Sequence, residues 1–310
     1  MICEEAQEIV GILNLRYEEQ LHHAAMIAEI MEFVVDSRYR RTICPTTIKK
    51  KENSMNFKLR TGISIMLALA LVFALAACAS GSNDGYRGIE VASPDWVGKL
   101  DAAKDAEQML IVAAFSDDAT DAWVSLHEKQ SDGSWHMIMT SPGFIGKNGL
   151  GKTREGDAKT PAGVFHFNRA FGIADDPGCA IPYVKADNDT YWSGDPRDGY
   201  RYNELVSLKE LPGLDLESGD SEHIIDYPYH YQYCLNISYN EEGTPGLGSA
   251  IFLHCLGPAK PFTGGCVAIP EDHMRYVMQK VNGDTAVVID TYEALSEGED
   301  WPDSTWPQDR

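Results

Sequence analysis

Basic residues are scarce in this chain of 310 residues. It contains 26 Lys and Arg against 47 Asp and Glu, which gives a formal net charge of −21. Residues 1–80 hold nine basic and nine acidic residues, so all of the negative charge belongs to residues 81–310. A domain this acidic repels phosphate backbones and anionic lipid head groups. The composition therefore excludes nucleic acid as a partner, and any attachment to a membrane must have another source.

Cysteine is also scarce, and long apolar runs are nearly absent. The chain has seven cysteines and no C-x-x-C pair, the close spacing that structural zinc sites usually use. It has no internal repeat. The single long apolar stretch starts at Ile63 and is shorter than the roughly 20 residues that a membrane-spanning helix needs. These absences disfavour a zinc module, a repeat protein and an integral membrane protein.

The apolar stretch belongs to a segment with the pattern of an export signal. The segment "MNFKLRTGISIMLALALVFALAAC" begins at Met55 with a short basic flank and ends in Leu-Ala-Ala-Cys78. It resembles a bacterial lipoprotein signal peptide with its lipobox. The resemblance implies that residues 55–77 are removed and that Cys78 is lipidated. We therefore expect an extracytoplasmic protein that is lipid-anchored to the bacterial cell membrane; a buried core helix is the alternative.

Residues 1–54 precede this segment and have a different pattern. Apolar residues recur at helical spacing in residues 4–35 and predict an amphipathic helix. A signal peptide does not normally follow such a segment. We interpret Met55 as the translation start, which makes residues 1–54 an artefact of the gene model. A cytoplasmic extension with an uncleaved anchor is the alternative.

Residues 89–292 contain repeated signals for β-strands. Gly, Pro, Asn and Asp clusters separate short β-type runs, so we expect a mainly β domain. One strong helix signal begins at Pro270, in "PEDHMRYVMQKV". A flexible tether (78–88) and a loose acidic tail (293–310) flank the domain. The predicted strands are "QMLIVAAF", "AWVSLHEK", "WHMIMTSPG", "GVFHF", "YQYCLNISY", "SAIFLHC" and "TAVVID".

The stretch "IFLHCLGPAKPFTGGCVAIP" contains the best candidates for catalysis. His254 closes an apolar strand, and Cys266 follows Gly264 and Gly265 after a short loop. A strand, a loop and a return can bring an imidazole beside a thiol, so that the histidine takes the proton and the sulfur attacks. We expect this pairing to lower the pKa of Cys266. We also expect the Gly265 and Cys266 N–H groups to form an oxyanion hole.

Three other interpretations of the cysteines are open at this point. A metal site would use His254, Cys255, Cys266 and His273. A disulfide between Cys255 and Cys266 would suit an oxidising compartment but would consume the nucleophile. Cys179 and Cys234 could form another disulfide, but they are equally plausible as buried free thiols.

The candidate residues occur in a recognisable signature. His254, followed by Thr263-Gly264-Gly265-Cys266, resembles the active-site signature of L,D-transpeptidase (YkuD-like) catalytic domains. The upstream segment "GLGKTREGDAKTPAGVFHF" resembles that family's Gly-Asp-x-x-Thr-Pro-x-Gly-x-Phe motif, and the whole resemblance covers about residues 108–290. We expect a structural turn, rather than contacts with substrate, from Gly156, Asp157, Thr160 and Pro161.

The chain departs from the commoner signature at several positions. Gly264 stands where many members have a second histidine, and Ala268 stands near the usual Arg or Asn. The spacing between His254 and Cys266 is also shorter than usual. The nucleophile and the base carry over, whereas the polar roles of the missing residues do not.

The resemblance implies a fold, a substrate and a set of roles. The fold would be a mainly β, L,D-transpeptidase-like sandwich or barrel with a few short helices. Cys266 would be the nucleophile, His254 the base and the Cys255 carbonyl the third member of a triad, with Gly265 supplying an oxyanion donor. The candidate substrate-binding residues are Thr263, Gly264, Tyr229, Tyr231 and Trp192.

We therefore expect a monomeric peptidoglycan L,D-transpeptidase. Cys266 would form a thioester with a stem peptide, release D-alanine and transfer the acyl group to an amine, without a metal or an organic cofactor. An L,D-carboxypeptidase would instead resolve the same thioester with water. A catalytically silent wall-binding lipoprotein is the third possibility, because the second histidine is missing.

Overall fold

The structure is a computed structural model, and it describes residues 2–5, 8–20, 25–35, 86–258 and 260–299. The contacts divide the chain into two compact units, Met1–Gly81 and Ser82–Asp309, with Arg310 grouped with the first. The signal-like segment, residues 55–78, lies outside the described residues. Within the described ranges, no helix combines the length and the apolar character needed to cross a membrane.

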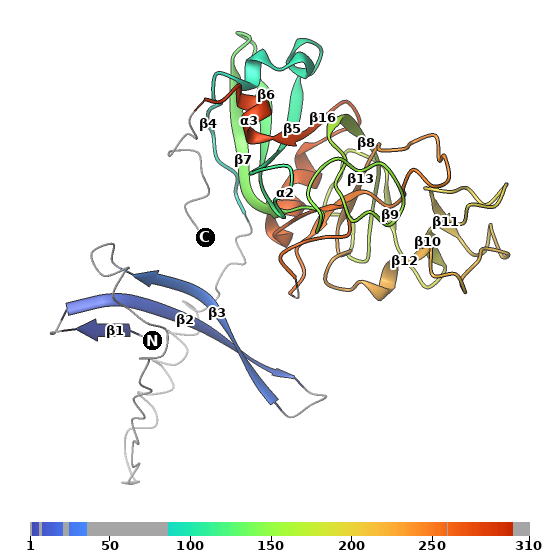
Figure 1. Ribbon diagram of the computed structural model, residues 1–310, viewed down its shortest axis with the longest axis horizontal. Coiled ribbons are helices and arrows are strands. Elements are labelled where there is room, and N and C mark those ends of the chain that lie inside the picture. Colours follow the sequence, from blue (N-terminus) through green and yellow to red (C-terminus); the bar gives the residue numbers. More distant parts are fainter. Residues whose placement is uncertain (1, 6–7, 21–24, 36–85, 259, 300–310) are drawn as a thin grey trace, which may run out of the picture. The chain divides into compact units, whose positions relative to one another are not determined.

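The first unit contains a three-stranded antiparallel sheet rather than the predicted helix. The sheet has the order β1-β2-β3 (Figure 1). The helix prediction for residues 4–35 is therefore wrong. The sequence "LNLRYE" at 13–18 alternates apolar and polar residues, which is the period of a strand. The strands are β1 (Ile2–Glu5), β2 (Glu8–Gln20) and β3 (Ala25–Val35).

Eight strands of the second unit close into a barrel (Figure 1). Their order is β13-β14-β15-β7-β6-β5-β16-β8, and β8 pairs back to β13, so no barrel strand is left with a free edge. This confirms the expected mainly β fold, and all seven predicted strands are present. The strands are β5 (Gln108–Ala114), β6 (Asp121–Lys129), β7 (Trp135–Phe144), β8 (Gly163–Gly172), β13 (Cys234–Ile237), β14 (Phe252–Cys255), β15 (Val267–Ile269) and β16 (Ala286–Thr291). Outside the barrel, β4 (Val91–Ala92) pairs with β7 and β9 (Tyr183–Lys185) pairs with β8.

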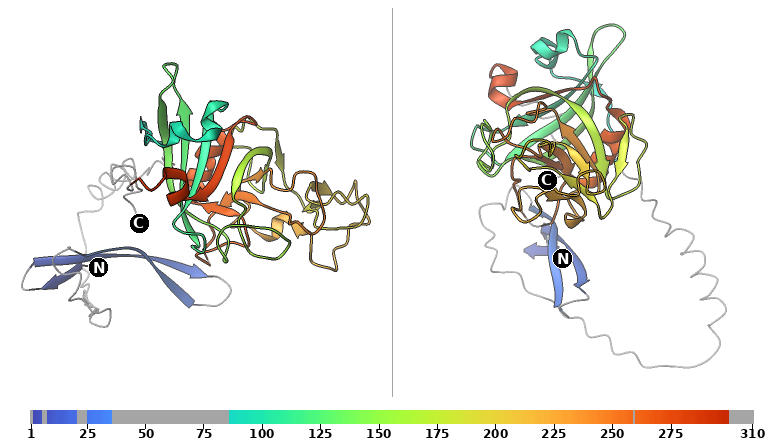
Figure 2. Two further views of the ribbon diagram at one scale, coloured as in Figure 1. Left: turned by 45° about the horizontal axis from the view of Figure 1, so that its top comes forward. Right: turned by 90° about the vertical axis from the view of Figure 1, so that its right-hand side faces the viewer.

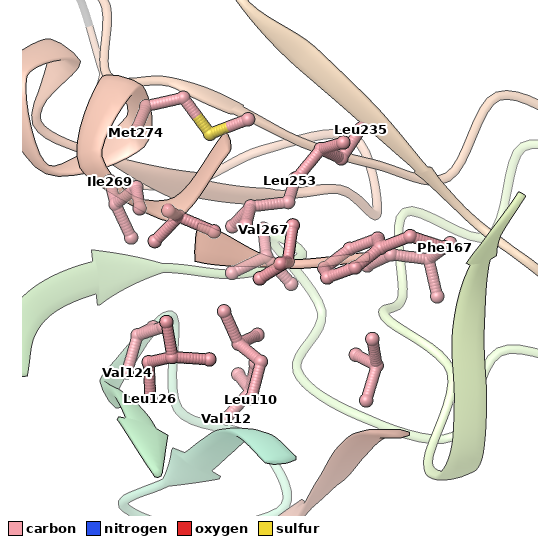
Figure 3. Packing of buried hydrophobic residues seen from close by; sticks show 14 of the residues in the cluster. Leu110, Val112, Val124, Leu126, Phe167, Leu235, Leu253, Val267, Ile269 and Met274 are labelled. Carbon is pink, nitrogen blue, oxygen red and sulfur yellow. The ribbon is translucent and has the colours of Figure 1, made fainter. Parts of the chain in front are cut away.

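Alternate residues of the barrel strands build two separate cores. Leu110 and Val112 of β5 belong to the large cluster inside the barrel, together with residues of β6, β14 and β15 (Figure 3). Met109 and Ile111 point the other way and pack against two short 3₁₀ helices and a short α-helix. Every residue of β5 is therefore buried, which explains its unbroken apolar run after Gln108. The covering elements are η2 (Val97–Lys99), η3 (Asp101–Lys104) and α3 (Tyr292–Ser296).

The predicted helix after Pro270 is confirmed as α2 (Glu271–Lys280). Its Met274, Val277 and Met278 are buried in the barrel core, and the helix begins directly after β15. The loose tail expected from residue 293 instead begins with α3, because Leu295 packs into the outer core. The folded domain thus extends beyond the predicted boundary.

A small second sheet, with the order β11-β10-β12, lies at the end of the domain away from β5 and β6 (Figures 1 and 2). Its strands are very short, and the sequence patterns did not predict them. The sheet matters for function because β12 and the turn that follows it border the candidate site. The elements are β10 (Thr190–Trp192), β11 (Leu205–Ser207), β12 (Glu222–His223) and η4 (Ile224–Asp226).

Candidate active site

Two neighbouring parallel strands bring the signature residues to one cavity. In the pairing of β14 with β15, His254 lies opposite Ala268. Cys266 directly precedes β15, and its Sγ accepts a hydrogen bond from the Phe252 N–H at 3.3 Å. His254 and Cys266 both line a cavity of about 620 Å³. The loop between them returns the chain alongside β14, so residues twelve positions apart border the same space.

The thiol of Cys266 is buried and neutral. Its side chain donates a hydrogen bond to the Ala250 carbonyl at 3.1 Å, and only 8% of the residue is exposed. Burial, followed by the negative charge of Glu222, raises the pKa of Cys266 to about 12, although the Phe252 N–H opposes this effect. The predicted lowering of this pKa is therefore wrong. The sequence placed a histidine near the thiol but could not show how much water the fold removes from it.

The imidazole of His254 is held in one tautomer. Its Nδ1 lies 2.8 Å from the Cys255 carbonyl oxygen. Because a carbonyl only accepts hydrogen bonds, Nδ1 carries the proton and Nε2 is left to accept one. Burial lowers the pKa of His254 to about 4; the Cys255 hydrogen bond opposes the shift, and His230 adds to it. The contact expected between His254 and the Cys255 carbonyl is thus present, and it leaves a neutral base.

The side chain of Cys255 faces away from the cavity. It belongs to the inner core of the barrel, whereas Cys266 belongs to a separate cluster with Phe252 and Trp192. The four cysteines between residues 86 and 299 are free thiols, so neither of the two considered disulfides is formed. Strand alternation explains the separation, since adjacent residues such as His254 and Cys255 point to opposite faces.

The four residues considered for a metal site do not converge. His273 lies on α2, where its ring stacks against Tyr86 at 3.9 Å between centroids. Cys255 points into the core, away from His254 and Cys266. In the part of the chain that the structure describes, no group of three or more His, Cys, Asp or Glu is arranged to hold a metal ion.

The two glycines before the nucleophile differ in their surroundings. Gly265 has a φ of +141°, and a Cβ added there would lie 2.8 Å from the Lys159 carbonyl oxygen. Its N–H donates to Thr263 Oγ1 at 3.1 Å, so this donor is engaged in the present conformation and its oxyanion role stays a prediction. Gly264 has no described atom within 4 Å of an added Cβ, and it lines the cavity.

The upstream motif holds this loop in place. The Thr160 hydroxyl donates to the Gly265 carbonyl at 2.8 Å and accepts from the Gly146 N–H at 2.9 Å. Asp157 accepts hydrogen bonds from three backbone N–H groups and from the Lys152 ammonium at 3.0 Å. Burial would raise the pKa of Asp157, but these donors lower it to about 2. The structural turn expected from this motif is present, but Gly156 also lines the cavity, which the prediction of a purely structural role did not include.

The candidate substrate-binding residues fall into two groups. Thr263, Gly264 and Tyr231 line the cavity. Tyr229 and Trp192 are not among the lining residues: Tyr229 is 64% exposed, and Trp192 is 2% exposed within an aromatic cluster. Thr263 also donates to the Cys266 carbonyl at 2.7 Å, so it holds the backbone of Cys266 as well as bordering the cavity.

Trp192 is connected to Cys266 through a chain of hydrogen bonds. Its Nε1 donates to Asn203 Oδ1 at 3.0 Å, and the same oxygen accepts from the Ala250 N–H at 3.0 Å. The Ala250 carbonyl in turn accepts the thiol proton of Cys266. Ala250 has a φ of +56°, which is unusual for a residue with a Cβ, so these hydrogen bonds hold a strained backbone beside the thiol.

Other cavity residues were missed as contributors to the site. They come from loops and from the small sheet, whose sequences lack any periodic pattern. The missed residues with a titratable or aromatic group include Lys152, Glu155, Asp220, Glu222 and Tyr227.

Comparison with known proteins identifies the family. No curated protein matches the chain. Among solved structures, it is similar to the helical cell shape determining protein Pgp2 from Campylobacter jejuni, with 16% identity, a TM-score of 0.32, and coverage of 63% of this chain and 54% of that chain. It is also similar to Mycobacterium tuberculosis L,D-transpeptidase 1, with 13% identity, a TM-score of 0.27, and coverage of 59% and 62%. The chain thus spans less than two thirds of either structure's length. The family model of the L,D-transpeptidase catalytic domain (YkuD) matches residues 122–289, more than half of the chain, and the chain therefore belongs to this family.

Proposed function

We propose that this protein is a peptidoglycan L,D-transpeptidase. The observation that carries the proposal is the pair formed by Cys266 and His254, which line one cavity while the Cys255 carbonyl leaves Nε2 of the imidazole as the proton acceptor. Membership of the family supports wall stem peptides as the substrate class. The braced loop before Cys266 supports a fixed nucleophile.

The first half of the reaction forms a thioester. His254 Nε2 takes the thiol proton as Cys266 Sγ attacks the carbonyl of the third stem residue. The C–S bond forms, the C–N bond to the terminal D-alanine breaks, and His254 returns the proton to the departing amine. Because both groups are neutral at rest, the proton moves during the attack rather than before it.

In the second half of the reaction, an amine from a neighbouring stem resolves the thioester. The amine nitrogen attacks the thioester carbonyl and gives up a proton to His254. The C–N bond forms, the C–S bond breaks, and His254 returns the proton to the sulfur of Cys266. Water in place of the amine would give hydrolysis, so the products distinguish the two outcomes.

The decisive test is replacement of the nucleophile. With the full-length protein in detergent, a tetrapeptide-stem donor and an amine acceptor, Cys266→Ser should reduce D-alanine release about a thousandfold or more. His254→Ala should cause a loss of the same order, and the double variant should be little worse, because the two groups act as a unit. Mass analysis follows D-alanine and the cross-linked product.

Each alternative gives a distinct result in this assay. Release of D-alanine without cross-linked product would indicate the carboxypeptidase. A wild-type protein that forms no adduct at Cys266 would indicate the silent wall-binding protein. Loss of wild-type activity with a chelator would indicate a metal site. Turnover by Cys266→Ser at the wild-type rate would overturn the mechanism.

We further propose that the enzyme works outside the cytoplasm on a lipid anchor at Cys78. The lipobox-like sequence and the wall substrate of the proposed reaction support this location. Intact-mass analysis of the membrane fraction should find a lipidated chain that begins at Cys78. A product that begins at Met1 and stays in the cytoplasm would contradict it.

A further inference from the structure

A carboxyl group of the cavity takes no part in the mechanism described so far. Glu222 lies on β12, is partly buried, and lines the same cavity as Cys266. Its Oε2 accepts a hydrogen bond from the Tyr231 hydroxyl at 2.5 Å. Among the described residues, the Glu222 carboxylate accepts no other hydrogen bond and forms no ion pair. The carboxyl group is therefore fixed on one side and unpaired in charge.

Tyr231 connects this carboxyl group to the catalytic pair. The tyrosine is 5% exposed, and its ring packs edge to face against His254 and Phe252, with centroids 5.5 and 5.6 Å apart. The hydroxyl that binds Glu222 is thus held by the residues that surround the nucleophile. Glu222 is also close enough for its charge to raise the pKa of Cys266. The carboxyl group and the thiol share one solvent-poor space.

The positive groups that line the cavity are engaged elsewhere. The Lys152 ammonium lies 3.0 Å from Asp157 and donates to the Arg154 carbonyl at 3.2 Å. Lys147 and Lys260 are both exposed, and each lies over the ring of Phe262, at 5.6 and 5.9 Å from its centroid. None of the three lysines pairs with Glu222.

The other carboxylates of the cavity differ from Glu222. Glu155 accepts hydrogen bonds from the Tyr202 and Ser249 hydroxyls, and Asp220 is exposed to water. Burial, with a smaller contribution from the charge of Glu155, raises the pKa of Glu222 to about 7 even though Tyr231 donates to it. Glu222 is therefore the cavity carboxylate that would gain most from the arrival of a cation.

We propose that Glu222 binds the ammonium group of the incoming acyl acceptor and so favours transfer of the acyl group over its hydrolysis. This inference rests on the proposed function. The ammonium passes one proton to the Glu222 carboxylate, and the free amine attacks the thioester carbonyl. The C–N bond forms and the C–S bond breaks, while a second amine proton reaches the sulfur of Cys266 through His254. Glu222 then releases its proton to solvent.

Two acceptors separate charge recognition from general reactivity. The full-length protein is acylated with a tetrapeptide-stem donor and offered either a stem-peptide amine, which is an ammonium at pH 7, or hydroxylamine, which is uncharged at that pH. Glu222→Gln should lower kcat/KM for the ammonium acceptor by about tenfold or more. The ratio of kcat/KM for the ammonium acceptor to that for hydroxylamine should fall by the same factor, because any change in the reactivity of Cys266 affects both acceptors alike, and the hydrolysed fraction should rise with the ammonium acceptor.

Matched variants exclude an indirect effect of charge. Asp226 is four positions from Glu222 in the sequence, lies outside the cavity lining, and has an exposed carboxylate 3.1 Å from His223. Asp226→Asn should leave kcat/KM unchanged for both acceptors. Glu222→Asp keeps the charge on a shorter side chain. Its preference for the ammonium acceptor over hydroxylamine should fall less than that of Glu222→Gln. If Glu222→Gln does not fold, Glu222→Asp still gives the comparison.

The outcomes separate the two proposals. Equal losses for both acceptors, or an unchanged ratio in every folded Glu222 variant, would overturn the role of Glu222 and leave the transpeptidase proposal standing. A wild-type protein that never forms the Cys266 adduct would overturn the proposed function and this inference with it. A selective loss in Glu222→Gln but not in Asp226→Asn is the expected result.

Discussion

At the scale of single residues, burial decides the protonation of Cys266 and His254, the proposed catalytic pair. The pKa of Cys266 is raised and the pKa of His254 is lowered, because the charged form of each group is disfavoured where water is removed. The resting pair is thus a neutral thiol and a neutral imidazole, not a thiolate and an imidazolium. A neutral thiol of this kind reacts slowly with electrophiles, because the thiolate is the nucleophilic form.

The reactivity of the thiol should follow its raised pKa. We expect alkylation of Cys266 by iodoacetamide to accelerate by about tenfold for each pH unit between pH 7 and 9.5, without a plateau, since the thiolate is the reacting form. Peptide mapping by mass spectrometry measures the rate, and Cys266→Ser identifies the adduct. A plateau below pH 8 would show that a thiolate already exists at rest.

At the scale of elements, the loop before β15 depends on glycine at one position and not at its neighbour. Gly265 combines a positive φ with close approach to the Lys159 carbonyl, whereas Gly264 faces open space. Thr160 donates to the Gly265 carbonyl and Thr263 to the Cys266 carbonyl, which are the two carbonyl groups on either side of the Cys266 Cα. The loop is therefore set by backbone geometry as much as by side chains.

Alanine at these two positions should have different effects. Gly265→Ala should lower the free energy of unfolding by about 1–3 kcal/mol, because the added Cβ meets the Lys159 carbonyl in an unfavourable backbone conformation. Gly264→Ala should change it by less than about 0.5 kcal/mol. Urea unfolding at pH 7 measures both variants. Equal destabilisation of the two would contradict the assigned conformation of the loop.

At the scale of the whole molecule, the barrel wall buries a histidine that does not line the cavity. His127 of β6 is fully buried, with Nδ1 2.8 Å from Ser93 Oγ and Nε2 2.7 Å from Ser125 Oγ. Burial lowers the pKa of His127 to about 3 from an ordinary value of 6.5. The folded domain can therefore keep this imidazole only in its neutral form.

Stability should fall as the pH drops below about 6.5. Between pH 6.5 and 3, His127 is protonated in the unfolded chain but not in the folded chain, so acid favours unfolding. At pH 5 this costs about 2 kcal/mol; His254 acts in the same direction, whereas Glu222, whose pKa is raised in the folded state, opposes part of the loss. The urea midpoint should be lower at pH 5 than at pH 7, and His127→Gln should reduce this pH dependence. Identical pH dependence in both proteins would refute the assignment.

Much of the fold and of the site could be predicted from local patterns. The strand runs, the helix after Pro270 and the turn around Asp157 depend on side-chain periodicity and turn chemistry that neighbouring residues specify. The short strands β10 and β12 could not be predicted, because two or three residues carry no period and gain stability only from their partners. The helix prediction at the N-terminus failed because the helical period of about 3.6 residues and the strand period of about 2 residues each fit part of that stretch.

The sequence by itself determined the acidic character of the domain and the mainly β fold, and it led to Cys266 and His254 as the proposed nucleophile and base. These depend on composition, on local periodicity and on a short signature. Only the tertiary structure decided that the thiol is neutral, that Trp192 acts through Asn203, and that Glu222 reaches the cavity. The physical reason is that burial and charge pairing depend on which distant segments meet, and barrel closure and the packing of the small sheet bring those segments together.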